Sequence, residues 1–403
     1  MKTRSTIQIL TLLAALSGAE SLIAQGSLTP PAGTPGPQMK SLQELWDKLQ
    51  MIENQNTTLQ AYVGLLMADA GISLTWQIST VASAGDIGEY PSLAFGPDGQ
   101  PAIACYERTS GDLKLARFDG ANWTVETVDS TGDVGQYASL AFAPDGQPAI
   151  AYYDATNGDL KYRRWDGASW TTWTVESAGV VGRSASLKFG PGGQPGIAYL
   201  DSSNSSIKYA YWSGLNWVRQ TVDTSIGWAY ASLAYGPDGQ PAIAYKKGIA
   251  VTCARYNGSI WTPTEVQQVG GTGKGETPRL AFGSDGQPRI SFSASDSLGS
   301  ASLATFNGSN WGVVTIASSA YRIFDTSLAI GPNGQPAVSY REEPTLKIVR
   351  QAGNGPSETV SDGINTAFTS LAFGPDGQPA IAFHDATNGN LMIARMGTFQ
   401  GAP

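Results

Sequence analysis

The stretch "SLAFAPDGQPAIAYYD" (139–154) decides the fold, because close copies of it return along the chain. The tripeptide Gly-Gln-Pro within it begins at seven positions: Gly99, Gly146, Gly193, Gly239, Gly286, Gly334 and Gly377. Successive copies lie 47, 47, 46, 47, 48 and 43 residues apart. Periods of about 40–50 residues are typical of propeller blades. We therefore expect one blade per copy.

Each copy divides into four short strands, named A to D here. In the second copy they are "SLAF" (139–142), "PAIAYY" (148–153), "LKYRRW" (160–165) and "WTTWTVE" (170–176). Pro-Asp-Gly between A and B, and Asp-Gly between C and D, predict tight hairpin turns. Strands A and B are nearly all apolar, so we expect neighbouring blades to cover them.

The ends of the repeat region predict a closed ring. A lone D-type strand, "TWQISTVA" (75–82), precedes the first copy, and the seventh copy stops after its C strand, "LMIARM" (391–396). The early strand can complete the last blade and remove an open sheet edge. The expected fold is an all-β, seven-bladed β-propeller over residues 75–399, with four strands per blade, closed by the N-terminal strand.

The first 38 residues have the pattern of an export signal and a linker. Residues 1–24 combine a basic start with a ten-residue apolar run, "IQILTLLAAL" (7–16), and cleavage after Ala19 or Ala24 fits a signal peptide. Residues 25–38 are rich in Pro and Gly, as in an extended linker. We expect a secreted or cell-surface protein, with the periplasm as an alternative.

Residues 39–72 predict a helix that precedes the repeats. Apolar residues recur there every seven positions in two interleaved series, and Asn56 is the single polar residue of one series. A lone buried Asn fixes register between partner helices. The pattern favours a coiled-coil stalk that makes a homodimer or homotrimer through residues 39–70. An amphipathic helix that lies on the following domain is the alternative.

The net charge and the absence of certain motifs argue against several classes of partner and cofactor. The chain has 33 acidic and 25 basic residues, a net charge of −8, which argues against nucleic acid. Beyond the signal, no apolar stretch is long enough for membrane insertion as a helix. The sequence contains no Cys/His cluster with zinc spacing and no phosphate-binding glycine loop. We therefore predict no cofactor and no metal.

Candidate site residues lie where the copies differ, since a residue shared by all seven serves the fold. The A–B and C–D turns are tight, so the opposite face, with the D–A and B–C connections, is the expected binding face. There, residues just before strand A or at the end of strand B are the candidates: Tyr90, Tyr137, Tyr153, Asp154, Arg183, Trp228, Tyr230, His384 and Asp385. Aromatic faces can stack on sugar rings, and carboxylates can accept hydrogen bonds from sugar hydroxyls.

Each candidate also has a structural interpretation. The tyrosines can cap junctions between blades, and the carboxylates can cap turns. His384, the only histidine, occupies a position held by Tyr in other copies, as expected of a tolerated substitution. Nothing in the sequence places it in a Ser-His-Asp triad.

The repeat "SLAFAPDGQPAIAYYDATNGDLKYRRWDGASW" (139–170) resembles a unit of exported bacterial seven-bladed β-propeller proteins, over about residues 75–396. Its "LKYRRWDGASW" portion is loosely similar to blade motifs of fucose-type propeller lectins, which implies sugar pockets between blades. Sialidase-like propellers carry turns of the form Ser-x-Asp-x-Gly-x-x-Trp, and this sequence has none.

We therefore expect an exported, non-catalytic propeller whose ligand is a glycan. A protein-interaction or cell-surface scaffold with a protein ligand is the first alternative. A sialidase-like glycoside hydrolase, with Asp154 or Asp385 in catalysis, is the second.

Overall fold

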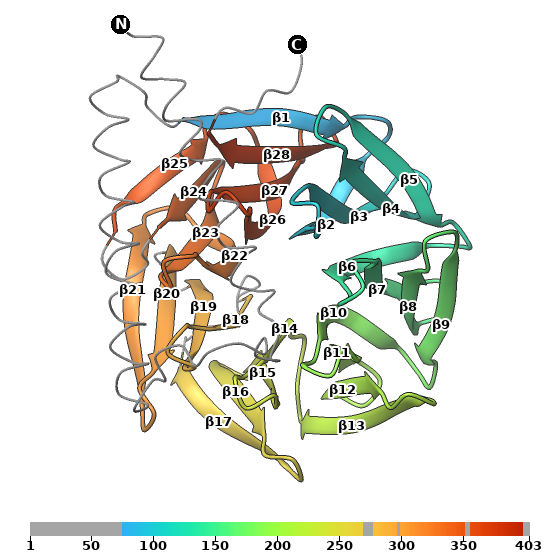
Figure 1. Cartoon of the computed structure of the whole chain (residues 1–403). Helices are drawn as coiled ribbons and strands as arrows, with labels where there is room; N and C mark the ends of the chain where they lie inside the picture. The colour runs from blue at the N-terminus through green and yellow to red at the C-terminus, as the bar shows by residue number, and fades with distance from the viewer. Residues whose placement is uncertain (1–74, 269–276, 296–298, 351–354, 398–403) are drawn as a thin grey trace, which may run out of the picture. The chain divides into compact units, whose positions relative to one another are not determined.

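The computed structural model describes residues 75–268, 277–295, 299–350 and 355–397, and the statements below concern these residues. The predicted signal peptide, linker and coiled-coil helix lie outside them. The described chain forms 28 strands in seven antiparallel sheets of four strands each. Figure 1 shows the sheets arranged as blades around a ring. The prediction of an all-β, seven-bladed propeller with four strands per blade is confirmed.

The strands run from the axis outward in each blade, and their bounds are as follows. Blade 1 is β2 (Ile87–Phe95), β3 (Pro101–Glu107), β4 (Asp112–Phe118) and β5 (Trp123–Asp129); blade 2 is β6 (Val134–Phe142), β7 (Pro148–Asp154), β8 (Asp159–Trp165) and β9 (Trp170–Glu176). Blade 3 is β10 (Val181–Phe189), β11 (Pro195–Asp201), β12 (Ser206–Trp212) and β13 (Trp217–Thr224); blade 4 is β14 (Ala231–Tyr235), β15 (Pro241–Lys247), β16 (Ala250–Tyr256) and β17 (Trp261–Gln268). Blade 5 is β18 (Arg279–Phe282), β19 (Pro288–Ser295), β20 (Gly299–Phe306) and β21 (Trp311–Ser319); blade 6 is β22 (Ile323–Ile330), β23 (Pro336–Glu342), β24 (Thr345–Val349) and β25 (Ser357–Ser361). Blade 7 is β26 (Thr366–Phe373), β27 (Pro379–Asp385), β28 (Asn390–Met396) and β1 (Trp76–Ala82).

The closing strand pairs as the sequence predicts. β1 runs antiparallel to β28, with Trp76 opposite Met396 and Thr80 opposite Met392. It is therefore the outermost strand of blade 7, although it comes first in the described chain (Figure 1). None of the described residues forms a helix of the length and apolarity needed to span a bilayer.

The hydrophobic core is divided among the interfaces between neighbouring blades. Each buried apolar cluster combines two adjacent blades; one, for example, joins Leu113 and Leu115 of blade 1 to Ile150 and Tyr152 of blade 2. Strands β3, β7, β11 and β27 are buried along their whole length. The apolar side chains are therefore used between blades, and the innermost strands can present polar side chains to the axis.

Candidate functional site

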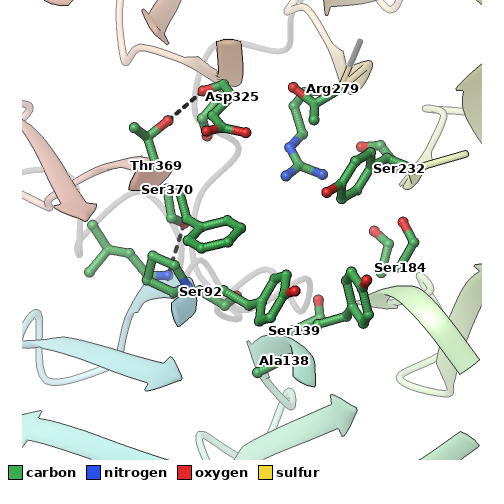
Figure 2. Close-up of a pocket in the computed structure, with 18 of the residues that line it drawn as sticks. Ser92, Ala138, Ser139, Ser184, Ser232, Arg279, Asp325, Thr369 and Ser370 are labelled. Carbon is green, nitrogen blue, oxygen red and sulfur yellow. Dashed lines mark hydrogen bonds between the residues drawn. The ribbon is translucent and has the colours of Figure 1, made fainter. Parts of the chain in front are cut away.

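A cavity of about 190 Å³ lies on the axis of the ring and is lined by the first strands of all seven blades. Its lining has layers, because each blade contributes equivalent residues. The outer layer contains Tyr90, Tyr137, Ser184, Tyr230, Thr277, Asp325 and Phe368. The second layer, two residues further along each strand, contains Ser92, Ser139, Ser186, Ser232, Arg279, Ser327 and Ser370. Figure 2 shows part of this lining.

The outer layer is aimed at the cavity by an unusual backbone. Five of its members have φ between 49° and 57°: Tyr90, Tyr137, Ser184, Asp325 and Phe368. This left-handed conformation costs a non-glycine residue about 1–2 kcal/mol. The strand ladders also shift register here, for example between Glu89 and Ser92. A bulge of this kind re-aims a side chain. Because it recurs in five blades, it belongs to the repeat, and in each of them it directs a side chain into the cavity.

Aromatic side chains from four blades meet at this layer. The ring centroid of Tyr90 lies 4.4 Å from that of Tyr137 and 4.6 Å from that of Phe368. Tyr137 in turn lies 6.3 Å from Trp228 and 6.4 Å from Tyr230. Burial raises the pKa of Tyr90 and of Tyr230 to about 12. Their hydroxyls are therefore neutral at ordinary pH and can both donate and accept hydrogen bonds.

Arg183 extends the aromatic cluster outward. Its guanidinium carbon lies 5.4 Å from the ring of Tyr153 and 5.1 Å from the ring of Trp228, within the range of cation–π contacts. Tyr153 is buried, whereas Trp228 is 54% exposed. The structure thus brings together six sequence-predicted residues: Tyr90, Tyr137, Tyr153, Arg183, Trp228 and Tyr230.

The two predicted carboxylates lie elsewhere and serve their own turns. Asp154 accepts hydrogen bonds from the backbone N–H of Asn157 at 3.0 Å and from its Nδ2 at 2.8 Å. Asp385 accepts one from Nδ2 of Asn388 at 2.7 Å. Both carboxylates are at least 96% buried, being 1% and 4% exposed. This geometry is that of the turn caps that the alternative interpretation anticipates.

His384 also has a structural partner. Its Nε2 lies 2.9 Å from Oδ1 of Asp86, and the residue is 4% exposed. At the equivalent position of blade 1, the hydroxyl of Tyr106 donates to Oδ1 of Asp133 at 2.8 Å. His384 therefore replaces a tyrosine in a repeated link between blades, as expected of a tolerated substitution.

The second layer joins the blades by a ring of hydrogen bonds. In six blades a serine Oγ accepts from a leucine N–H of the next blade at 2.9–3.0 Å: Ser92 from Leu140, Ser139 from Leu187, Ser186 from Leu233, Ser232 from Leu280, Ser327 from Leu371, and Ser370 from Leu93. In blade 5 the residue is Arg279, and in the described residues no such bond reaches Leu328. The ring is interrupted only at this junction.

Three charged residues of the cavity escaped the sequence reasoning: Lys188, Arg279 and Asp325. A signal for them was present, because "SLKF" (186–189) and "RLAF" (279–282) depart from the repeated "SLAF". Asp325 replaces an aromatic or hydroxyl residue of the outer layer, and its Oδ2 lies 3.4 Å from Nε of Arg341. Burial raises the pKa of Asp325, and Arg341 opposes that shift. The described residues contain no cluster of His, Cys, Asp and Glu suited to a metal ion.

Comparisons with known proteins identify the fold. No family model matches the sequence, and neither does any curated protein. Among solved structures, a catalytically inactive virginiamycin B lyase from Staphylococcus aureus, solved with quinupristin, has a TM-score of 0.56 and 13% identity, over 81% of this chain and 100% of that chain. An ulvan lyase of polysaccharide lyase family PL25 has a TM-score of 0.55 and 12% identity, over 78% and 95%.

A lectin also shows this likeness. SapL1, solved with alpha methyl fucoside, has a TM-score of 0.49 and 14% identity, over 70% of this chain and 97% of that chain. At 12–13% identity, the likeness to the two lyases establishes the fold alone. The chain has the β-propeller fold of the two lyases, and its ligand has to be inferred from its own axial cavity.

Proposed function

We propose that this protein is an exported, non-catalytic propeller that binds a carbohydrate at the mouth of its axial cavity. The observation that carries the proposal is the cluster of Tyr90, Tyr137, Tyr230, Trp228 and Phe368, contributed by four blades and set over a cavity lined by hydroxyls. Aromatic faces supply apolar contact area, and the phenol and serine hydroxyls supply polar partners that fix orientation.

The volume and the surroundings of the cavity support a saccharide as the ligand. A cavity of 150 Å³ holds a benzene ring, so about 190 Å³ accommodates one ring-sized group. Further units of a chain would extend toward the exposed Trp228. The ulvan lyase that shares the fold has been solved bound to -[GlcA(1-4)Rha3S]-, with a TM-score of 0.54 and 11% identity. It is a precedent for a saccharide on such a propeller.

The carboxylates support a non-catalytic role over glycoside hydrolysis. Two-carboxylate hydrolysis needs a pair of acids that flank the bond to be cut. Among the described residues that line the cavity, Asp325 is the single carboxylate, and it is paired with Arg341. Asp154 and Asp385, the predicted acids, cap their own turns.

A glycan array with the wild type and two variants tests the proposal. Tyr137→Ala removes the centre of the aromatic cluster, and Trp228→Ala removes its exposed edge. Because one well-packed aromatic contact contributes about 1–3 kcal/mol, each variant is expected to lose roughly tenfold or more in affinity.

The control for this array is Trp165→Ala, an aromatic residue of β8 remote from the axis, which should bind as the wild type does. Glycan binding unaffected by Tyr137→Ala and Trp228→Ala would contradict the proposed site. Turnover of aryl glycosides, or release of an unsaturated uronide from a polysaccharide, would contradict the non-catalytic role.

We also propose that the chain is a homodimer or homotrimer through residues 39–70, so that several cavities engage one multivalent surface. The solution mass of the protein with and without residues 39–70 checks this. The expected result is a dimer or trimer that becomes a monomer when the segment is removed. A monomer in both cases contradicts the stalk.

A further inference from the structure

Two unpaired cations in the axial cavity point to the charge of the ligand. Lys188 and Arg279 both line the cavity, and neither forms an ion pair or hydrogen bond with any residue that the structure describes. Figure 2 shows the guanidinium of Arg279 directed toward the middle of the cavity. Asp325, the single carboxylate on the described lining, is paired with Arg341 and also attracts Arg279. The described lining therefore has an excess of positive charge, although the whole chain carries −8.

Both cations stand at positions where the other six copies of the repeat carry a different, uncharged residue. Arg279 stands where six blades have a serine that bonds the next blade, so it forgoes that bond. Lys188 stands where the other six copies have alanine: Ala94, Ala141, Ala234, Ala281, Ala329 and Ala372. Lys188 is exposed and Arg279 is half-buried, so both side chains are accessible to a ligand in the cavity. Desolvation by the surrounding blades and repulsion from Arg279 both lower the pKa of Lys188.

The cations lie beneath the aromatic layer. Arg279 belongs to the second layer, two residues beyond the outer one along its strand. Lys188 is two residues beyond Ser186 in β10, and at about 3.3 Å per residue it begins about 6.5 Å deeper than the serine layer. A sugar ring held at the mouth by Tyr90 and Tyr137 would thus project one substituent down toward both cations.

We propose that Arg279 and Lys188 form an anion subsite that holds the carboxylate or sulfate of an acidic sugar whose ring contacts the aromatic layer. The inference rests on the proposed carbohydrate function and specifies its ligand class. A guanidinium offers paired N–H donors that match either oxyanion, and an ammonium adds a point charge. Bound between them, the anion relieves the repulsion between the two cations. The hydroxyls of the serine layer can bind the ring substituents around it.

Calorimetric titration with matched oligosaccharides tests the subsite. The probes are an oligogalacturonate, the same oligomer with its carboxyl groups reduced to alcohols, and a sulfated galactan oligomer free of uronate. Wild-type protein is expected to bind at least one acidic probe more tightly than the neutral one. The preferred acidic probe identifies the anion as carboxylate or sulfate.

The variants Arg279→Ser and Lys188→Ala restore the residues that the other copies carry, so both are expected to fold. For Arg279→Ser the thermal midpoint should not fall, because the new hydroxyl can accept the N–H of Leu328. Loss of one charge-assisted contact lowers affinity for the acidic probe about tenfold to hundredfold, and leaves affinity for the neutral probe unchanged. Arg164→Ser is the control, since it removes an equal charge at the exposed pair with Asp145. It should change affinity by less than about twofold.

The outcomes separate the two proposals. Equal binding of acidic and neutral probes by the wild type, lost in Tyr137→Ala, keeps the carbohydrate function and overturns the anion subsite. Acidic-probe binding that persists in Arg279→Ser and Lys188→Ala also overturns the subsite. Absence of binding to these probes and to every glycan of the array overturns both.

Discussion

A chain that begins at residue 83 is expected to lose the closed ring, whereas a chain that begins at residue 75 keeps it. The difference is strand β1, which pairs with β28 through six residue positions and completes blade 7. Backbone hydrogen bonds contribute about 1 kcal/mol each, and β1 also buries Val81 between blades 7 and 1. The loss is thus comparable with the total stability of a domain, about 5–15 kcal/mol.

Without β1, strand β28 becomes an open edge. Its residues Leu391, Ile393 and Ala394 are at most 1% exposed in the intact ring. An exposed apolar edge promotes association with other chains. Circular dichroism, thermal unfolding and gel filtration of the two chains check the prediction. A chain starting at residue 83 that stays monomeric and unfolds at the same temperature as the longer one would show that ring closure contributes little.

The sequence was sufficient for the fold because each blade solves the same local problem. Turns such as Pro97-Asp98-Gly99 repeat with the strands they join, and Gly99 has the positive φ of 75° expected of its turn. The closing strand followed from counting strands at the two ends. No such counting applies to a ligand site, which depends on side-chain direction.

The aromatic part of the site was predictable because the D–A connections all end at the same face, one step before the cavity. The carboxylates were not, since the position of Asp154 at a strand end does not say whether it faces the axis or its own turn. A local signal was present: Asp154, Asp201 and Asp385 each precede an Asn by three residues, and each bonds that Asn. Such spacing predicts a turn cap.

Lys188 and Arg279 were not predicted as site residues for a different reason. The apolar pattern of strand A predicts a strand that neighbouring blades cover on both faces, and in such a strand no residue is expected to face a ligand. In the structure strand A is the innermost strand of its blade, and every second residue of it faces the cavity. Comparing the seven copies residue by residue singles out Lys188 and Arg279. Departures of one copy from an internal repeat are thus informative even in a strand that looks structural.

Gly135→Ala is expected to destabilise the protein far more than Gly167→Ala. Both glycines have a positive φ, 106° and 101°, that is unfavourable for alanine. A Cβ on Gly135 would lie 2.7 Å from the Cα of Leu113 in blade 1, whereas one on Gly167 meets nothing within 4 Å. The backbone strain therefore cancels in the comparison. The remaining difference is overpacking between blades, which costs roughly 1–3 kcal/mol.

The same pair of variants connects the fold to the site. Gly135 lies two residues before Tyr137 in β6, so a shift of this segment away from Leu113 would change the contact between Tyr137 and Tyr90. Gly135→Ala is therefore expected to weaken glycan binding as well as to lower the free energy of unfolding in urea. Gly167 lies in a turn between β8 and β9, and its variant should bind as the wild type does. Equal losses of stability in the two variants would show that φ alone, and not close packing between blades, requires glycine at 135.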